Sequence, residues 1–159
     1  MNFADTNWLE ALYFEPEEKE KQTRCATVER FMRKHGGQLG ISHLVYLEAR
    51  NVFSRNTREP EPEEWRRLLG DLNGLLYLDP MNWDALRRDA FSLFAKYSPK
   101  ANLGTLDIAI LASARLAGAT RLLSFDETLK AVAVAEGLDV FPPLSTEGKR
   151  LFPEMRRRS

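Results

Sequence analysis

The sequence predicts an α/β protein, a three-layer α/β/α sandwich with a mainly parallel central sheet. Short apolar segments alternate with longer stretches of helical periodicity, and this alternation is typical of a parallel sheet covered on both faces. The chain has 159 residues, of which 43% are hydrophobic and 29% charged. That length and composition suit one domain with a continuous core, and they exclude an intrinsically disordered chain.

In the first third of the chain, apolar periodicity predicts two strands and three helices. Two glycines after His35 end the second helix, and Ser42 is a favourable N-cap for the third. We expect strands at residues 1–4 and 38–41, and helices at 6–14, 17–34 and 42–54.

The rest of the chain continues the alternation. A loop is expected at residues 56–62, which hold two prolines. Asp79, before Pro80, is interpreted as the N-cap of the helix that follows. We expect helices at 63–72, 80–98, 105–117 and 128–136, and strands at 75–78, 121–125 and 138–141.

The chain shows no repeat and no low-complexity linker. We therefore expect one domain over residues 1–143, followed by a basic C-terminal tail at residues 144–159.

A cytoplasmic protein with no membrane partner is expected. Cys25 is the only cysteine, so an internal disulfide is impossible and a reducing compartment is favoured. The first residues resemble no signal peptide. The most apolar segment, 108–114, is far shorter than the ~20 residues that span a bilayer.

Four acidic residues occupy informative positions: Asp5, Glu48, Asp107 and Asp126. Asp5 and Asp126 end expected strands, where ligands gather in a parallel sheet, and Asp107 opens a helix. Glu48 lies on the apolar stripe of its helix. Converging carboxylates repel one another, and hard divalent cations with oxygen ligands relieve that repulsion. The pattern predicts a divalent-metal site.

Each acid alone also has a structural explanation. Asp5 and Asp126 could be helix N-caps, and Asp107 could favour the helix dipole. Glu48 is harder to explain, because burying its carboxylate costs several kcal/mol unless donors or a cation compensate. An arginine partner would be such a cation.

In order and spacing, these residues resemble the acidic motifs of PIN-domain nucleases over about residues 1–142. In size and architecture the chain is most similar to VapC-type toxins of toxin–antitoxin pairs. Trp8 is bulkier than the aliphatic residue usual after the first motif. The resembling segments are Asp5-Thr6-Asn7, Ile41-Ser42-x-x-Val45-x-x-Glu48, Leu106-Asp107-Ile108 and Leu122-Leu123-Ser124-Phe125-Asp126.

The resemblance implies a metal-dependent endoribonuclease. Asp5 and Asp107 would be the core ligands of one or two Mg²⁺ or Mn²⁺ ions, completed by Asp126 and Glu48 directly or through water. Residues beside these ligands would orient the carboxylates through hydrogen bonds. The residues expected in that role are Thr6, Asn7 and Ser124.

The resemblance also implies partners: an RNA substrate, an antitoxin protein and a second copy in a homodimer. Residues 63–72 and 81–97 are the expected surfaces for protein partners. Because the formal net charge is zero, RNA would have to be held by a local basic patch. Arg50, Arg55, Arg58, Lys149, Arg150 and Arg156 to Arg158 are candidates, although each could equally be ordinary surface charge.

Two other functions compete with a nuclease. One is a non-catalytic PIN-like module that only binds RNA or protein, but such a module would be expected to lack one of the four acids. The other is a phosphotransfer enzyme with Asp5 as nucleophile. It is disfavoured because Asn7 stands where that chemistry needs a second aspartate.

Overall fold

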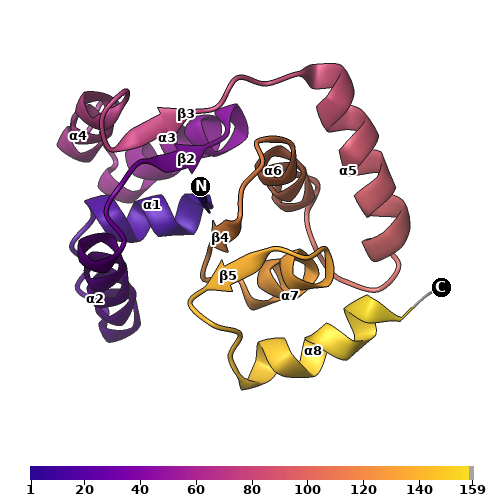
Figure 1. Cartoon of the computed structure of the whole chain (residues 1–159). Helices are drawn as coiled ribbons and strands as arrows, with labels where there is room; N and C mark the ends of the chain where they lie inside the picture. The colour runs from indigo at the N-terminus through magenta and orange to yellow at the C-terminus, as the bar shows by residue number, and fades with distance from the viewer. Residues whose placement is uncertain (158–159) are drawn as a thin grey trace.

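The computed structural model describes residues 1–157; Arg158 and Ser159 of the basic C-terminal run lie outside the described residues. Figure 1 shows the arrangement of the elements. The strands are β1 (Asn2–Ala4), β2 (Leu39–Ile41), β3 (Leu76–Leu78), β4 (Arg121–Leu123) and β5 (Asp139–Phe141). The helices are α1 (Thr6–Tyr13), α2 (Lys19–Lys34), α3 (His43–Thr57), α4 (Glu63–Asp71), α5 (Trp83–Tyr97), α6 (Thr105–Leu116), α7 (Glu127–Ala135) and α8 (Thr146–Arg156).

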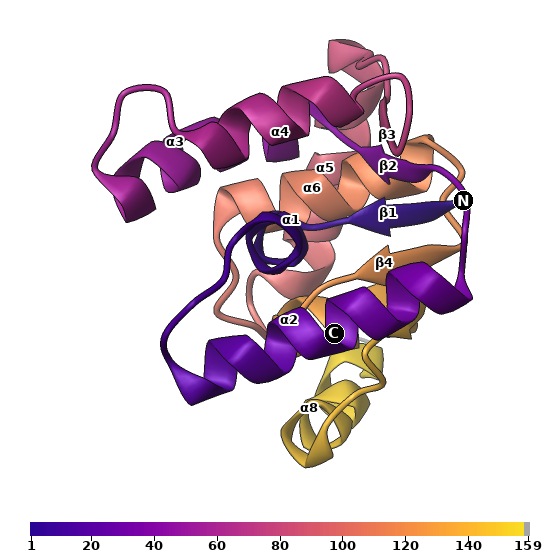
Figure 2. The ribbon, with the colours of Figure 1, turned by 90° about the vertical axis from the view of Figure 1, so that its left-hand side faces the viewer.

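The strands form one parallel sheet in the order β3-β2-β1-β4-β5. Figure 2 shows the arrows of β1, β2 and β4 pointing the same way, with α2 in front of the sheet and α5 and α6 behind it. Since β1 lies between β2 and β4, the carboxyl ends of these three strands meet at one edge of the sheet. The expected α/β/α architecture is confirmed.

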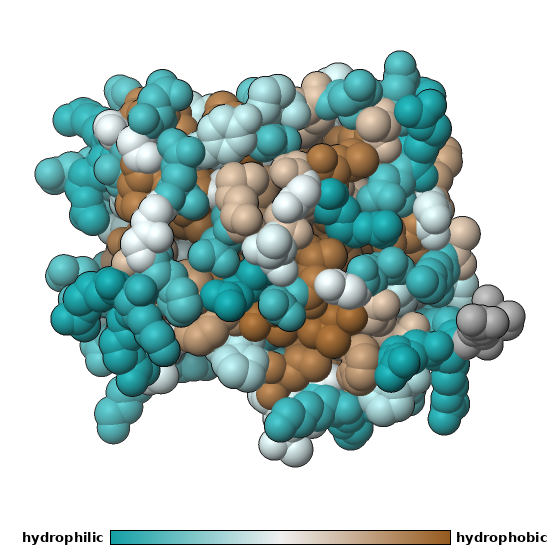
Figure 3. Space-filling view, in the orientation of Figure 1, coloured by the Kyte–Doolittle hydropathy of each residue, from teal (hydrophilic) through white to brown (hydrophobic). Residues whose placement is uncertain are grey.

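The outer surface is mixed in character. Figure 3 shows hydrophilic side chains around smaller hydrophobic patches, and the largest brown patch lies over the β5 and α7 region of Figure 1. Across residues 1–157, no helix is long and apolar enough to cross a bilayer.

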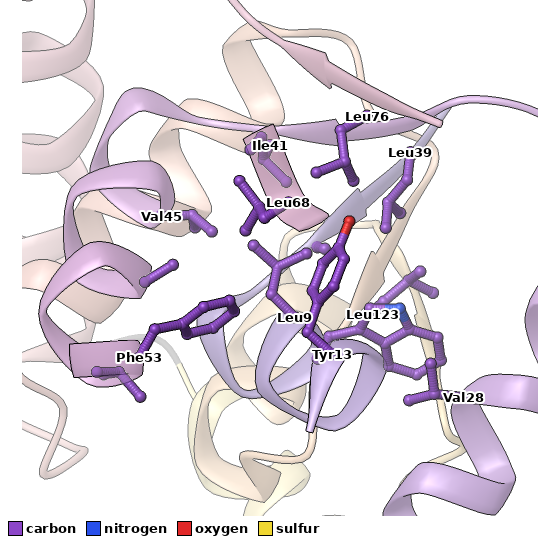
Figure 4. Close-up of a cluster of buried hydrophobic side chains, with 14 of the residues drawn as sticks. Leu9, Tyr13, Val28, Leu39, Ile41, Val45, Phe53, Leu68, Leu76 and Leu123 are labelled. Atoms are coloured by element: carbon purple, nitrogen blue, oxygen red, sulfur yellow. The ribbon is translucent and has the colours of Figure 1, made fainter. Parts of the chain in front are cut away.

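Buried side chains form one cluster on each face of the sheet. Within β4, Leu122 belongs to one cluster and Leu123 to the other, because successive side chains of a strand point to opposite faces. Figure 4 shows the first cluster, where residues of α1, α2, α3 and α4 pack against the sheet. Residues of α5, α6, α7 and α8 supply most of the second cluster. This packing on both faces fixes the helices that follow each strand end.

One cap differs from the sequence-based interpretation. Asp79 does not begin the helix after Pro80, because α5 starts only at Trp83 and its cap is Asn82. The Asn82 Oδ1 atom accepts a hydrogen bond of 3.0 Å from the Ala85 N–H. Asp79 instead extends β3, since its N–H donates to the Ile41 carbonyl at 2.9 Å.

The C-terminal segment contains a helix that the sequence did not predict. Helix α8 begins after Ser145, whose Oγ accepts a hydrogen bond of 3.3 Å from the Gly148 N–H. Met155, only 1% exposed, anchors the helix in the second cluster. The many charges of this segment and Pro153 inside it hide the helical pattern in the sequence.

Candidate metal centre

Asp5 is the most buried of the four acids. It follows β1 in an extended conformation and caps α1, so its carboxylate is fixed between a strand and a helix. Its Oδ1 accepts a hydrogen bond of 2.8 Å from the Thr6 N–H, and its Oδ2 accepts one of 2.8 Å from the Ser124 hydroxyl. The side chain is only 4% exposed.

Ser124 links Asp5 to Asp126. Its Oγ donates to Asp5 and accepts a hydrogen bond of 3.0 Å from the Asp126 N–H. Asp126 caps α7, with its Oδ1 accepting from the Leu129 N–H at 3.0 Å. The helix cap therefore occupies one oxygen of Asp126 and leaves its other oxygen free of protein donors within residues 1–157.

The expected orienting residues differ in what they do. Asn7 joins α1 to the strand end, because its Oδ1 accepts from the Phe125 N–H at 3.1 Å. Thr6 supports Asp5 through its backbone N–H. The Thr6 hydroxyl is buried, and within residues 1–157 it has no hydrogen-bond partner.

Glu48 and Asp107 are carried by two helices, α3 and α6. Glu48 is half-buried on α3, which begins directly after β2. Asp107 is half-buried in the first turn of α6, where the Gly104 backbone favours its ionised form.

Charge interactions link the four carboxylates in pairs. Burial raises the pKa of Asp5 to about 7, and the nearby charges of Asp107 and Glu48 add to the rise. Burial also raises the pKa of Asp107, with further contributions from Asp126 and Glu48. The structure therefore brings the four acids predicted from the sequence into electrostatic contact.

No protein cation balances this charge within the described chain. Over residues 1–157 none of the four carboxylates forms an ion pair with Lys, Arg or His, so the arginine explanation for Glu48 is not supported. In the same residues no three potential ligands lie close enough together to surround one metal ion. The free carboxylate oxygens and the unpartnered Thr6 hydroxyl are nevertheless the hard oxygen donors that Mg²⁺ and Mn²⁺ prefer. The residues fit such a cation, although the side chains do not form a closed cage.

The sequence reasoning missed a buried ion pair beside Asp126. The Lys130 Nζ atom lies 2.8 Å from Glu127 Oε1, and the lysine is only 1% exposed. Burial by itself would raise the pKa of Glu127, but the Lys130 ammonium lowers it below its usual range. A lysine in the otherwise apolar stretch after Leu129, three residues from a glutamate, was the available signal.

The basic residues suggested for RNA binding are not equivalent. Arg50 is engaged inside the protein, because its guanidinium donates to the Ser54 hydroxyl and the Pro60 carbonyl and lies over the Trp65 ring. It holds the connection between α3 and α4. The exposed candidates within residues 1–157 are Arg55, Arg58, Lys149, Arg150, Arg156 and Arg157.

Fold and site together define a class: parallel α/β sandwiches with carboxylates gathered at the carboxyl ends of the strands. The model of the PIN domain family matches residues 3–135, and the chain belongs to this family. No curated protein matches the sequence significantly.

Several solved structures share the fold. VapC20 of Mycobacterium tuberculosis, described as a toxin that cleaves the sarcin–ricin loop, superposes with a TM-score of 0.66 at 17% identity, covering 87% of this chain and 96% of that one. VapBC2 from Rickettsia felis, bound to a promoter DNA fragment, gives a TM-score of 0.61 at 16% identity, covering 87% and 96%. FitAcB from Neisseria gonorrhoeae gives 0.60 at 14% identity, covering 90% and 98%. At these identities the likeness establishes the fold alone.

Proposed function

We propose that this protein is a divalent-metal-dependent endoribonuclease, the toxin of a toxin–antitoxin pair. The observation that carries the proposal is the group of four carboxylates, in which Asp107 and Glu48 act on buried Asp5 and Asp126 acts on Asp107, with no balancing protein cation in residues 1–157. An enzyme gains nothing in stability from such a group, because each charge raises the cost of the others. A site that binds a cation explains it.

Asp5 and Asp107 would hold Mg²⁺ or Mn²⁺, with Asp126 and Glu48 completing the site. When bound, the cation supplies an activated water and positive charge opposite the RNA phosphate. The protein's own part is positioning: the Ser124 hydroxyl fixes one oxygen of Asp5 and the backbone N–H of Asp126 at the same time. The helices α1 and α7 begin at Asp5 and Asp126, so on this proposal the positive ends of their dipoles would favour an RNA phosphate held by these acids.

RNA as substrate and an antitoxin as partner are supported by the family and by the structures that share the fold. VapC20 is described as a toxin that cleaves the sarcin–ricin loop, and another structure that shares the fold is described as a toxin–antitoxin complex from Klebsiella pneumoniae. On this proposal the protein acts in the cytoplasm, where RNA is accessible.

Large apolar side chains on the surface support protein partners, an antitoxin and a second copy of the chain. On α5 and its neighbours, Trp83 is 69% exposed, Phe91 is 63% exposed and Leu116 is 49% exposed. Aromatic residues with this exposure are common in protein interfaces. Because of these exposed side chains, we propose that residues 81–97 form a surface for a protein partner.

The test is cleavage of total RNA by the purified protein in Mg²⁺ or Mn²⁺, beside the variant Asp107→Asn. The substitution keeps the size of the side chain and removes one charge from the site. We expect a loss of activity larger than the ~10–100-fold typical of residues that only orient a ligand.

Excess EDTA should abolish cleavage by the wild-type protein. Cleavage that persists in EDTA, or equal cleavage by both proteins, would reject the proposal. RNA binding without cleavage would identify a non-catalytic module instead.

A further inference from the structure

The family model ends at residue 135, before β5 and α8, and so leaves the C-terminal helix without a role. Helix α8 is joined to α7 by a polar contact at the end of α7 that carries Asp126. The contact consists of Lys130, Glu127, Pro142 and Ser145, and we call it the α7–α8 clasp.

Lys130 is the buried centre of the clasp. Its ammonium is 2.8 Å from Glu127 Oε1 and donates to the Pro142 carbonyl at 3.0 Å. A buried ammonium must keep such acceptors, because losing its hydration is costly. Lys130 therefore holds the first turn of α7 and the chain segment after β5 at a fixed distance.

Glu127 extends the clasp to α8. Its Oε2 accepts a hydrogen bond of 3.0 Å from the N–H of Ser145, the residue that caps α8. A Cβ atom on Gly148 would clash with Glu127 Oε2 and with the Leu144 side chain, so glycine lets the first turn of α8 approach this carboxylate without displacing either side chain. Glycine is otherwise an unfavourable residue inside a helix. The close approach explains its presence.

The clasp acts on the turn that carries Asp126. Glu127 is the next residue in the chain, and the Lys130 N–H donates to the Asp126 carbonyl at 3.0 Å. At its other end α8 is held too: the Lys100 ammonium donates to the Arg157 carbonyl, and Met155 packs in the cluster that contains Ile108 of α6. Helix α8 thus contacts the helix that Asp126 caps and the loop that leads to α6, the helix of Asp107.

We propose that the Lys130–Glu127 pair is a positioning device for the metal centre, through which α8 holds the Asp126 carboxylate in place for cation binding. This inference rests on the proposed function for the metal centre itself. The positioning, however, is a property of the folded chain and can be measured without metal or RNA.

The experiment compares Lys130→Met with Lys96→Met in the full chain. Lys130→Met keeps an unbranched side chain and removes the ammonium. Lys96→Met is the control: Lys96 lies on α5, and its Nζ is 2.9 Å from Oε1 of Glu136, the residue that follows α7 at the opposite end from Asp126. Each variant loses one Lys–Glu ion pair at an end of α7, but the Lys96 ammonium is half-exposed, and only the buried Lys130 pair lies beside Asp126.

The first readout is hydrogen exchange of the metal-free protein at the Asp126, Leu129 and Lys130 amides, which the turn protects. We expect Lys130→Met to speed their exchange about 10-fold or more relative to exchange elsewhere in the chain, and Lys96→Met to leave it unchanged. Equal protection in both variants would overturn the proposal.

The second readout is the Mn²⁺ concentration that gives half-maximal RNA cleavage. We expect Lys130→Met to raise it ~10–100-fold, with cleavage recovering at saturating Mn²⁺. A lower rate at every Mn²⁺ concentration with an unchanged midpoint would indicate a merely structural role and would also overturn the proposal.

If Lys130→Met does not fold, Gly148→Ala replaces it, because the added methyl group would clash with Glu127 Oε2 and the Leu144 side chain and so disturb the contact of α8 with Glu127, while Lys130 keeps its ammonium. The same two readouts apply. If the wild-type protein fails to cleave RNA, the proposed function fails, and the exchange measurement still decides whether the clasp orders the Asp126 turn.

Discussion

At the scale of single residues, Asp5 shows most clearly that the site is built at the expense of stability. Its carboxylate is buried, and both of its oxygens accept hydrogen bonds that favour the ionised form. Burial nevertheless dominates, and the pKa rises to about 7. Near neutral pH, the metal-free folded chain must therefore keep a proton on Asp5 or accept an unfavourable buried charge.

This pKa shift predicts how stability depends on pH. Between the unfolded value of 3.8 and about 7, the folded state binds more protons than the unfolded state, so stability falls as pH rises through this window and stays low above it. An asparagine at position 5 does not titrate, so it does not lose stability in this way as the pH rises. Without metal, we expect the stability advantage of Asp5→Asn over wild type to grow by about 2–3 kcal/mol between pH 5 and pH 8, measured by urea unfolding.

The control for this prediction is Asp139→Asn, the same chemical change at an exposed aspartate of β5. It should show no comparable change with pH. Adding Mn²⁺ at pH 8 should stabilise the wild type and not Asp5→Asn. A variant whose stability follows wild type at both pH values would contradict the burial of a protonated Asp5.

At the scale of single elements, α7 and α8 are linked through the buried ion pair of Lys130 and Glu127. The apolar stretch of α7 around Lys130 predicts burial, and the lysine predicts exposure. The structure resolves this conflict by placing Glu127 and the Pro142 carbonyl around the ammonium. The ion pair is tolerated because each partner is satisfied, and removing one partner should be costly.

Glu127→Ala should therefore destabilise the protein by about 3 kcal/mol or more, because it leaves the Lys130 ammonium buried with a single acceptor. Glu147→Ala, at an exposed glutamate of α8, should change stability by less than ~0.5 kcal/mol. Urea unfolding of both variants measures the difference. Equal effects would mean that Lys130 finds solvent or another acceptor in the variant.

At the scale of the whole molecule, the sequence predicted the layers and strand ends better than the contacts between distant segments. Patterns around Ala4 and Leu123 are local, so apolar periodicity could locate β1 and β4, and the acids that follow them. The hydrogen bond from Ser124 to Asp5 depends on the pairing of β1 with β4, which periodicity does not encode. Helix α8 was missed for the same reason, since tertiary packing of Met155 stabilises it.

The basic residues of the C-terminal segment are candidates for RNA binding. Truncating the chain after Pro143 would remove them but would also remove α8 and its buried Met155, so reversing the exposed charges is the cleaner test. We expect Lys149→Glu together with Arg150→Glu to weaken RNA binding and to lower the slope of log K against log salt by ~0.7 for each RNA phosphate that the variant no longer neutralises.

The same reversal at Arg33 and Lys34, exposed at the end of α2, is the matched control and should leave the slope unchanged. Binding titrations on single-stranded RNA at several salt concentrations provide the measurement. An identical weakening of binding in both double variants would show that only overall charge matters.

The order β3-β2-β1-β4-β5 has a consequence for protein synthesis. The central strand, β1, is made before its neighbour β4, which leads to Ser124 and Asp126, and β2 and β3 are made between them. The clasp residues follow later still. A chain interrupted before β4 lacks part of the metal centre, so on the proposed function a nascent chain of this toxin could not cleave RNA until β4 and the acid that follows it have been made.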